Sequence, residues 1–171
     1  ELIFVVDTSG SMGGAPIANA RNVLHRALDG LRPQDKFNVI RFSSTASAFW
    51  HRALEVNANN LQRAHRYVDG LQSGGGTEMS QALSMALNTH YSGDRYLRQV
   101  VFITDGSVGN EQALFQQIEQ SLGDNRLFTV GIGSAPNSYF MRKAAEFGRG
   151  SFSYVDDQSQ IEAVVGTMLK K

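Results

Sequence analysis

Short runs of consecutive apolar residues constrain the fold of this chain most strongly. Leu2–Val6 holds five apolar residues in a row, and Val100–Ile103 and Leu127–Val130 closely repeat the pattern. Runs of this length are typical of strands that are buried on both faces, as in a parallel sheet covered by helices. Phe37–Phe42 alternates more and predicts a further strand, and Ser151–Val155 predicts the last one.

Helical patterns separate these predicted strands. Their apolar residues recur at three- and four-residue steps, which is the spacing of one helix face. Two weaker segments, 46–50 and 52–56, predict either one bent edge strand or a hairpin. We therefore expect an α/β fold: a doubly wound, mostly parallel sheet with one short antiparallel edge strand and helices on both faces. The helical stripes lie in 17–31, 61–71, 79–87, 114–122, 139–147 and 161–169.

Composition limits the function classes. With 171 residues, 42% of them hydrophobic, the chain fits a single domain over 1–171 with a substantial core. It begins within a predicted strand, so we expect a domain cut from a longer multidomain protein. Lys plus Arg and Asp plus Glu number 16 each, which argues against a nucleic-acid binder. The absence of Cys excludes thiol catalysis and Cys-ligated zinc, and no apolar run predicts membrane insertion by this segment.

Three polar segments stand where an α/β sheet binds ligands, at the carboxyl ends of its strands. Asp7–Gly14 follows the first strand, Thr104–Gly106 follows the strand from Val100, and Ser73–Glu78 precedes the helix from Met79. Two Asp carboxylates and three hydroxyls from these segments form an oxygen-only set that suits Mg²⁺, Mn²⁺ or Ca²⁺ better than zinc or copper. We expect Asp7 to lie at a loop edge, outside the core. The candidate ligands are Asp7, Ser9, Ser11, Thr77 and Asp105.

This set of residues resembles a known site. Asp7-x-Ser9-x-Ser11, with Thr77 after a glycine loop and Asp105 at the end of a buried strand, resembles the metal-ion-dependent adhesion site of von Willebrand factor A (VWA) domains. The resemblance covers essentially the whole chain and implies the Rossmann-like VWA fold. Three segments look most like inter-alpha-trypsin inhibitor heavy chains and bacterial surface proteins, in which a VIT domain usually precedes: Phe4–Met12, Phe37–Ile40 and Phe102–Gly106.

The resemblance implies a role for each site residue. Ser9 and Ser11 would bind the metal through their hydroxyls, and Thr77 would bind it directly or through water. Asp7 and Asp105 would accept hydrogen bonds from metal-bound waters, or one of them would coordinate directly. Mg²⁺ is the expected cation, with Mn²⁺ or Ca²⁺ as alternatives. In the family a partner's carboxylate often completes the coordination, because neutral hydroxyls leave an ion that prefers six oxygens electron-poor.

The sequence thus predicts a non-catalytic binding module. We expect it outside the cell or at the cell surface, where it recruits a Glu or Asp of a protein or matrix partner through the metal. One alternative is an intracellular scaffold of the same fold, as in chelatase subunits. The least favoured alternative is a metal-dependent hydrolase, because no His, Lys or Glu stands in the metal motif as a general base. We expect no catalytic residue.

Other interpretations fail on single residues. The glycines at 74–76 lack the lysine of a Walker motif, so we interpret them as a loop that places the following threonine. Ser9 stands where the serine-hydrolase elbow requires glycine, and Pro136 replaces the last glycine of a dinucleotide fingerprint. Trp50 indicates an edge strand that packs on the core or, alternatively, a partner contact. Four scattered histidines, which we expect at surface or partly buried positions, show no metal-ligand spacing: His25, His51, His65 and His90.

Overall fold

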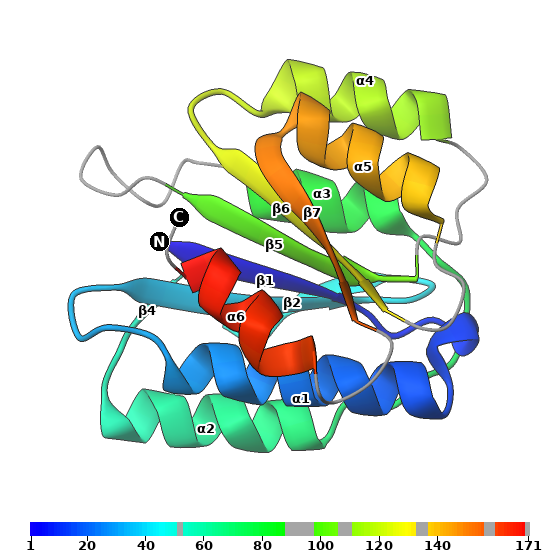
Figure 1. Cartoon of the computed structure of the whole chain (residues 1–171). Helices are drawn as coiled ribbons and strands as arrows, with labels where there is room; N and C mark the ends of the chain where they lie inside the picture. The colour runs from blue at the N-terminus through cyan, green and yellow to red at the C-terminus, as the bar shows by residue number, and fades with distance from the viewer. Residues whose placement is uncertain (51–52, 88–97, 106–110, 133–136, 156–159, 170–171) are drawn as a thin grey trace.

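Strands and helices alternate along the chain, as the sequence predicts (Figure 1). The computed structural model describes residues 1–50, 53–87, 98–105, 111–132, 137–155 and 160–169. The elements are, in order, β1 (Leu2–Asp7), η1 (Gly10–Met12), α1 (Ala15–Asp29), β2 (Lys36–Phe42), β3 (Ala46–Ala48), β4 (Leu54–Glu55), α2 (Ala58–Asp69), α3 (Met79–Leu87), β5 (Gln99–Thr104), α4 (Glu111–Ser121), β6 (Arg126–Ile132), α5 (Ser138–Phe147), β7 (Arg149–Val155) and α6 (Ile161–Leu169).

All of these strands belong to one sheet. Its order is β3-β2-β1-β5-β6-β7, and β4 also pairs with β2. The strands β1, β2, β5, β6 and β7 run parallel, whereas β3 and β4 are antiparallel to β2. The doubly wound, mostly parallel sheet is therefore confirmed. Its antiparallel edge consists of two short pieces, which come from the two weak segments of the sequence.

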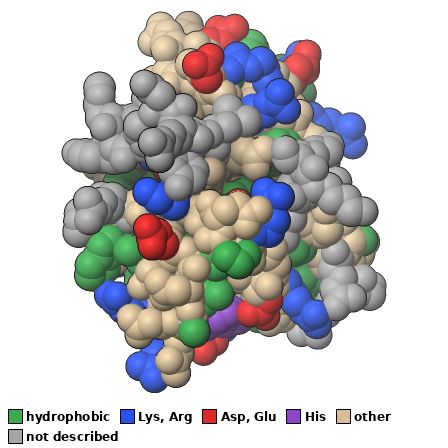
Figure 2. Space-filling view, turned by 90° about the vertical axis from the view of Figure 1, so that its left-hand side faces the viewer, with side chains coloured by type: hydrophobic (Ala, Val, Ile, Leu, Met, Phe, Trp, Pro, Cys, Tyr) green, Lys and Arg blue, Asp and Glu red, His purple; other side chains and the backbone are tan. Residues whose placement is uncertain are grey.

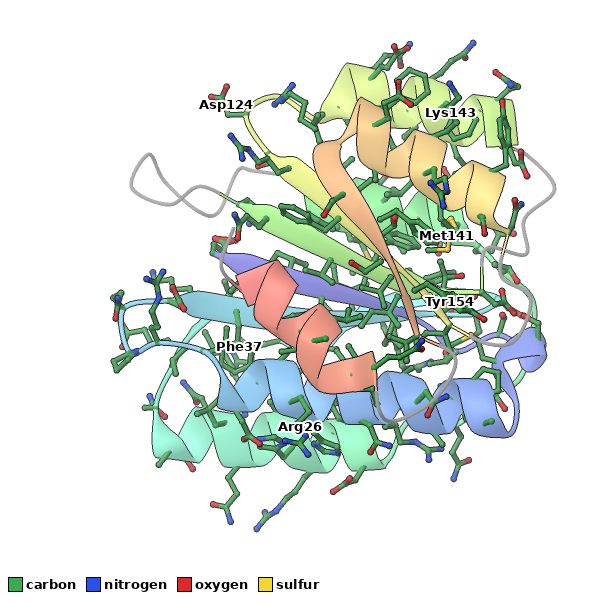
Figure 3. All side chains as sticks on the ribbon, viewed as in Figure 1. Arg26, Phe37, Asp124, Met141, Lys143 and Tyr154 are labelled. Atoms are coloured by element: carbon green, nitrogen blue, oxygen red, sulfur yellow. The ribbon has the colours of Figure 1, made fainter. Side chains whose placement is uncertain are left out.

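Helices cover both faces of the sheet and create two cores. The helices α1, α2 and α6 pack on one face, and α3, α4 and α5 pack on the other (Figure 1). Phe37 lies in the first core and Met141 in the second (Figure 3). Successive residues of β1 alternate between them, so that Phe4 joins the first core and Val5 the second. Burial on both faces explains why the strand is continuously apolar.

The helices begin where the sequence allows their first amides to be satisfied. The Asn57 side chain caps α2, since its Oδ1 accepts a hydrogen bond from the Asn60 N–H at 2.8 Å. Pro16 lies in the first turn of α1, where its missing N–H costs nothing. Among the helices of the described residues, none combines the length and apolar character that a membrane span requires.

The strand order creates one special position at the carboxyl edge of the sheet. From β1 the chain continues to β2 on one side, and β5 lies on the other side of β1. The helices that follow β1 and β5 diverge to opposite faces of the sheet, since α1 covers one face and α4 covers the other. In such sheets the divergence opens a crevice in which ligands bind. Asp7 ends β1 and Asp105 directly follows β5, so both flank this switch point.

Candidate metal centre

Asp7 is fully buried, with 0% of its surface exposed. The expectation that it lies at a loop edge is therefore wrong. It is the last residue of β1, paired with Phe42 of β2, so its neighbours in the sheet enclose it. Its Oδ2 accepts a hydrogen bond from the Thr104 hydroxyl at 2.7 Å, and its Oδ1 accepts one from the Ser9 N–H at 2.8 Å. These two donors fix the orientation of the carboxylate.

Burial raises the pKa of Asp7 above its ordinary value of 3.8, because the ionised carboxylate is held out of water. The hydrogen bonds from Ser9 and Thr104 oppose this rise in pKa, and the negative charge of Asp105 adds to it. The two carboxylates thus lie close enough to repel each other. A cation bound beside Asp7 would favour its ionised form.

The hydroxyls of Ser9 and Ser11 converge after β1. Their Oγ atoms are 3.1 Å apart. Neighbouring ligands of an octahedral Mg²⁺ with bonds of 2.0–2.1 Å lie about 2.9 Å apart, so this separation is close to that of two ligands of one ion. Ser9 is buried and Ser11 is exposed. The turn between them is closed by a 3.0 Å hydrogen bond from the Met12 N–H to the Ser9 carbonyl. One hydroxyl therefore lies within the protein and the other at its surface.

The loop that carries Thr77 lies directly against the loop after β1. The Gly74 N–H donates to the Thr8 carbonyl at 2.9 Å, and the Gly10 N–H donates to the Gly75 carbonyl at 3.0 Å. Thr77 follows this contact and is half-buried. The structure thus brings the third candidate hydroxyl to the same edge of the sheet as the serines.

Backbone geometry explains a glycine in this loop. Gly75 has φ +82°, which side chains rarely adopt, and a Cβ added there would lie 2.8 Å from the Ser44 Oγ. The same hydroxyl accepts a hydrogen bond of 2.9 Å from the Gly76 N–H. The Glu78 N–H donates to the Ser43 carbonyl at 2.6 Å. The glycine loop is consequently fixed on both sides of Thr77.

Asp105 is partly exposed at the end of β5. Its carbonyl accepts a hydrogen bond of 2.9 Å from the Asn137 N–H. The Asn137 side chain donates to Glu111 Oε1 at 2.7 Å and accepts from the Phe140 N–H at 3.1 Å. This asparagine therefore ties the end of β5 to the first turns of α4 and α5, and it fixes the backbone that carries Asp105.

Sequence reasoning missed two supporting residues, Thr104 and Asn137. The register of the parallel strands could have indicated Thr104, because Val6 pairs with Ile103 and the next positions are Asp7 and Thr104. Asn137 had no comparable signal, because its partners Asp105 and Glu111 are distant in sequence.

The arrangement suits a hard cation. All five candidate ligands offer oxygen, which Mg²⁺, Mn²⁺ and Ca²⁺ prefer. Asp7, Ser9 and Ser11 form one hydrogen-bonded group. Asp105 acts on this group through its charge, and the Thr77 loop is bonded to its backbone. Within the described residues, no group of three or more His, Cys, Asp or Glu side chains is arranged to hold a metal, so a site here depends on its hydroxyls.

A family model for the von Willebrand factor type A domain matches residues 1–154. The chain belongs to this family. The likeness to inter-alpha-trypsin inhibitor heavy chains is also confirmed: heavy chain H4 of Homo sapiens is 31% identical in an alignment of 157 residues that covers 85% of this chain and 17% of that protein. The chain spans less than a fifth of that relative's length. Domains of this family commonly mediate interactions between proteins.

Solved structures share the VWA fold. A von Willebrand factor type A protein from Catenulispora acidiphila superposes with a TM-score of 0.87 at 22% identity, over 98% of this chain and 41% of that one. Proximal thread matrix protein 1 from the mussel byssus, with a zinc-occupied MIDAS motif, superposes with a TM-score of 0.75 at 16% identity, over 98% of this chain and 45% of that one. At such identities the likeness establishes the fold alone.

Proposed function

We propose that this VWA domain binds a divalent cation at the switch-point edge and uses it to recruit a carboxylate from a protein or matrix partner. The observation that carries the proposal is the pair of Ser9 and Ser11 hydroxyls, 3.1 Å apart and directly beside the buried Asp7 carboxylate. The proposed ligands, direct or through water, are Asp7, Ser9, Ser11, Thr77 and Asp105.

The electrostatics of the edge support a cation. The buried carboxylate of Asp7 is destabilised in its ionised form by burial and by the charge of Asp105. A divalent ion beside Asp7 would offset that penalty. We propose Mg²⁺ as the ion, with Mn²⁺ or Ca²⁺ as alternatives, because every candidate ligand is an oxygen. The zinc in the MIDAS motif of the mussel protein is a precedent for a metal in this fold.

The open side of the site supports recruitment of a carboxylate. Ser11 is exposed, so an ion held by its hydroxyl would face solvent. Hydroxyls are neutral ligands, and they leave much of the ion's charge unbalanced. A Glu or Asp of the partner would gain a strong ion–ion contact at a position otherwise filled by water. None of the five residues is a His, Lys or Glu that could serve as a general base, so we propose binding without catalysis.

The likeness to heavy chain H4 favours a location outside the cell or at its surface, and we keep that location as part of the proposal. The rival is an intracellular scaffold of the same fold. A site that recruits carboxylates could act outside the cell or in an intracellular scaffold, so the chemistry of the site is what must be measured.

Recruitment can be measured with Mn²⁺ in the site. Protein-bound Mn²⁺ speeds the relaxation of water protons that exchange through its coordination positions. Acetate, as a minimal carboxylate, should displace this water and reduce the enhancement, whereas neutral acetamide of similar shape should not. The Ser11→Ala variant controls for Mn²⁺ outside the site. If acetate and acetamide change the relaxation enhancement of fully bound Mn²⁺ equally, the proposal is contradicted.

A further inference from the structure

A second polar cluster joins α1 to α2 through two histidines. The Nδ1 atoms of His25 and His65 lie 2.6 Å apart, and their nearly parallel rings (15°) have centroids separated by 4.8 Å. On the outer sides, His25 Nε2 lies 2.8 Å from Asp69 Oδ1 and His65 Nε2 lies 2.9 Å from Asp29 Oδ1. The result is a continuous chain of four side chains, carboxylate–imidazole–imidazole–carboxylate.

The cluster arises from one spacing that occurs in both helices. His25 and Asp29 are four residues apart on α1, and His65 and Asp69 are four residues apart on α2. Residues at this spacing lie on one helix face. Each histidine then pairs with the aspartate of the opposite helix. The histidines are 40 residues apart in sequence, which explains why their spacing gave no metal signal. His51 and His90 lie outside the described residues.

The hydrogen bonds of the outer nitrogens leave no hydrogen for the contact between the two Nδ1 atoms. An ionised carboxylate only accepts, so each Nε2 must carry the hydrogen that it donates to its aspartate. In a neutral imidazole the other nitrogen then presents a lone pair. The ring centroids are farther apart than the Nδ1 atoms, so the rings meet end to end and the two lone pairs face each other. At 2.6 Å they repel unless a positive charge lies between them.

We propose that His25 and His65 form a second metal site, which takes a divalent transition-metal ion such as Zn²⁺ between their Nδ1 atoms. Imidazole nitrogen suits Zn²⁺, Ni²⁺ and Cu²⁺, in contrast to the oxygen set at the sheet edge. A metal-binding histidine almost always donates its other N–H to a carboxylate or carbonyl, which orients the ring and makes its free nitrogen more basic. Asp69 and Asp29 are already in that position. Together the two carboxylates match the charge of the ion.

The site needs a small movement to accept the ion. With Zn–N bonds of 2.0–2.1 Å, two ligands of a tetrahedral zinc are about 3.3 Å apart, so the nitrogens must separate by about 0.7 Å. The histidine side chains are 26% and 27% exposed, so the rings can turn and water can reach the ion. Figure 2 shows histidine surface bordered by acidic side chains on this face.

Water would fill the remaining coordination positions. Two nitrogen ligands are consistent with the lack, among described residues, of a metal-holding group of three or more His, Cys, Asp or Glu side chains. The site is therefore weaker than a structural zinc site with four protein ligands. A bound ion would cross-link α1 to α2 at the surface.

Zinc calorimetry in the Asp105→Ala variant tests the proposal, because that background weakens the oxygen site and keeps the two proposals distinguishable. We expect about one Zn²⁺ per domain at neutral pH. In the same background, His25→Gln and His65→Gln should each weaken zinc binding at least tenfold. Arg66 is exposed and lies beside His65 on α2. Arg66→Gln should therefore leave zinc binding unchanged. Zinc uptake that survives in the His25→Gln/His65→Gln double variant would overturn the proposal, as would the absence of uptake in the Asp105→Ala background.

Nitrogen NMR gives a second readout that needs no histidine variant. In long-range ¹H–¹⁵N spectra, Zn²⁺ should shift Nδ1 of both His25 and His65, while both Nε2 atoms keep their hydrogens. If the spectra show Nε2 ligation, or show a proton between the rings that excess Zn²⁺ does not displace, the pair is a proton-bridged contact and the metal proposal is wrong.

Discussion

The hydroxyl of Thr104 donates a 2.7 Å hydrogen bond to the buried carboxylate of Asp7, across the contact between β5 and β1. The bond joins the two strands that flank the switch point. Asp105, the next residue after Thr104, leaves the sheet toward the same edge. The strands β1 and β5 thus fix the position of the candidate metal centre, and the loops supply its remaining candidate ligands.

Removing this donor should affect both stability and metal binding. Thr104→Val keeps the shape of the side chain but leaves Asp7 Oδ2 without the hydroxyl. We expect the free energy of unfolding to fall by about 1–3 kcal/mol in urea titrations, the usual range for a buried hydrogen bond to a charged group. Mg²⁺ affinity, measured by calorimetry, should fall as well.

A matched control for Thr104→Val is available on the neighbouring strand. The hydroxyl of Thr129, also buried, donates to the Met141 carbonyl at 2.9 Å, away from Asp7. Thr129→Val should therefore reduce stability without changing Mg²⁺ affinity. Equal effects of both variants on Mg²⁺ binding would show that Thr104 acts only through general stability.

Asp7→Asn should change how the stability of the metal-free domain depends on pH. The pKa of Asp7 is raised in the folded state, so its ionisation opposes folding. Its contribution to stability is fully present below about pH 3.8, the ordinary value, and is lost as the pH rises through the raised folded pKa. Asn cannot ionise and should lack this loss.

Urea titrations in chelator, from about pH 3.5 to 7, can compare the wild type with Asp7→Asn. We expect the wild type to lose stability relative to the variant as pH rises, and excess Mg²⁺ to restore only the wild type. Curves that stay parallel over the whole pH range would mean that burial of the Asp7 charge has no energetic consequence.

Gly75→Ala should strain the loop that carries Thr77. Its positive φ and the 2.8 Å approach of a Cβ to Ser44 Oγ predict a loss of about 1–3 kcal/mol of stability, together with weaker Mg²⁺ binding. Gly123 also has a positive φ (+57°), but nothing lies within 4 Å of its Cβ position. Gly123→Ala should cost less and leave Mg²⁺ binding intact. A Gly75→Ala variant that binds Mg²⁺ normally would exclude a role for the loop.

Mg²⁺ should raise the melting temperature of the domain. An ion that binds only the folded state at 100 times its Kd adds about 2.7 kcal/mol of stability. For a domain of this size that corresponds to roughly 5–10 °C. In thermal melts, Mg²⁺ should raise the melting temperature of the wild type and have little effect on that of Asp105→Ala. An identical shift in both would place the stabilising ion elsewhere.

Much of the fold could be predicted from local patterns. The apolar run of β1 indicated a strand buried on both faces, and Asn57, which caps α2, is of a residue type favoured at helix N-caps. The edge beside β2 stayed ambiguous because Ala46–Ala48 and Leu54–Glu55 are short and contain no fully buried residue, so neither shows a strong alternation of apolar and polar residues.

The residues of the candidate site could be predicted from the sequence, but the burial of Asp7 could not. Motif spacing indicated five residues at one edge, whereas the burial of Asp7 depends on its pairing with Phe42 and Thr104 across the sheet. Contacts between distant residues carry no periodic signal. For the same reason, the sequence could not indicate that His25 and His65 meet between two helices.

The most direct test of the account is calorimetric titration of the chelator-stripped domain with Mg²⁺, beside the Asp105→Ala variant. We predict binding of one Mg²⁺ per wild-type domain and its loss in the variant. A wild-type domain that takes up no Mg²⁺, or a variant that binds it equally well, would contradict a cation site at Asp7, Ser9, Ser11, Thr77 and Asp105.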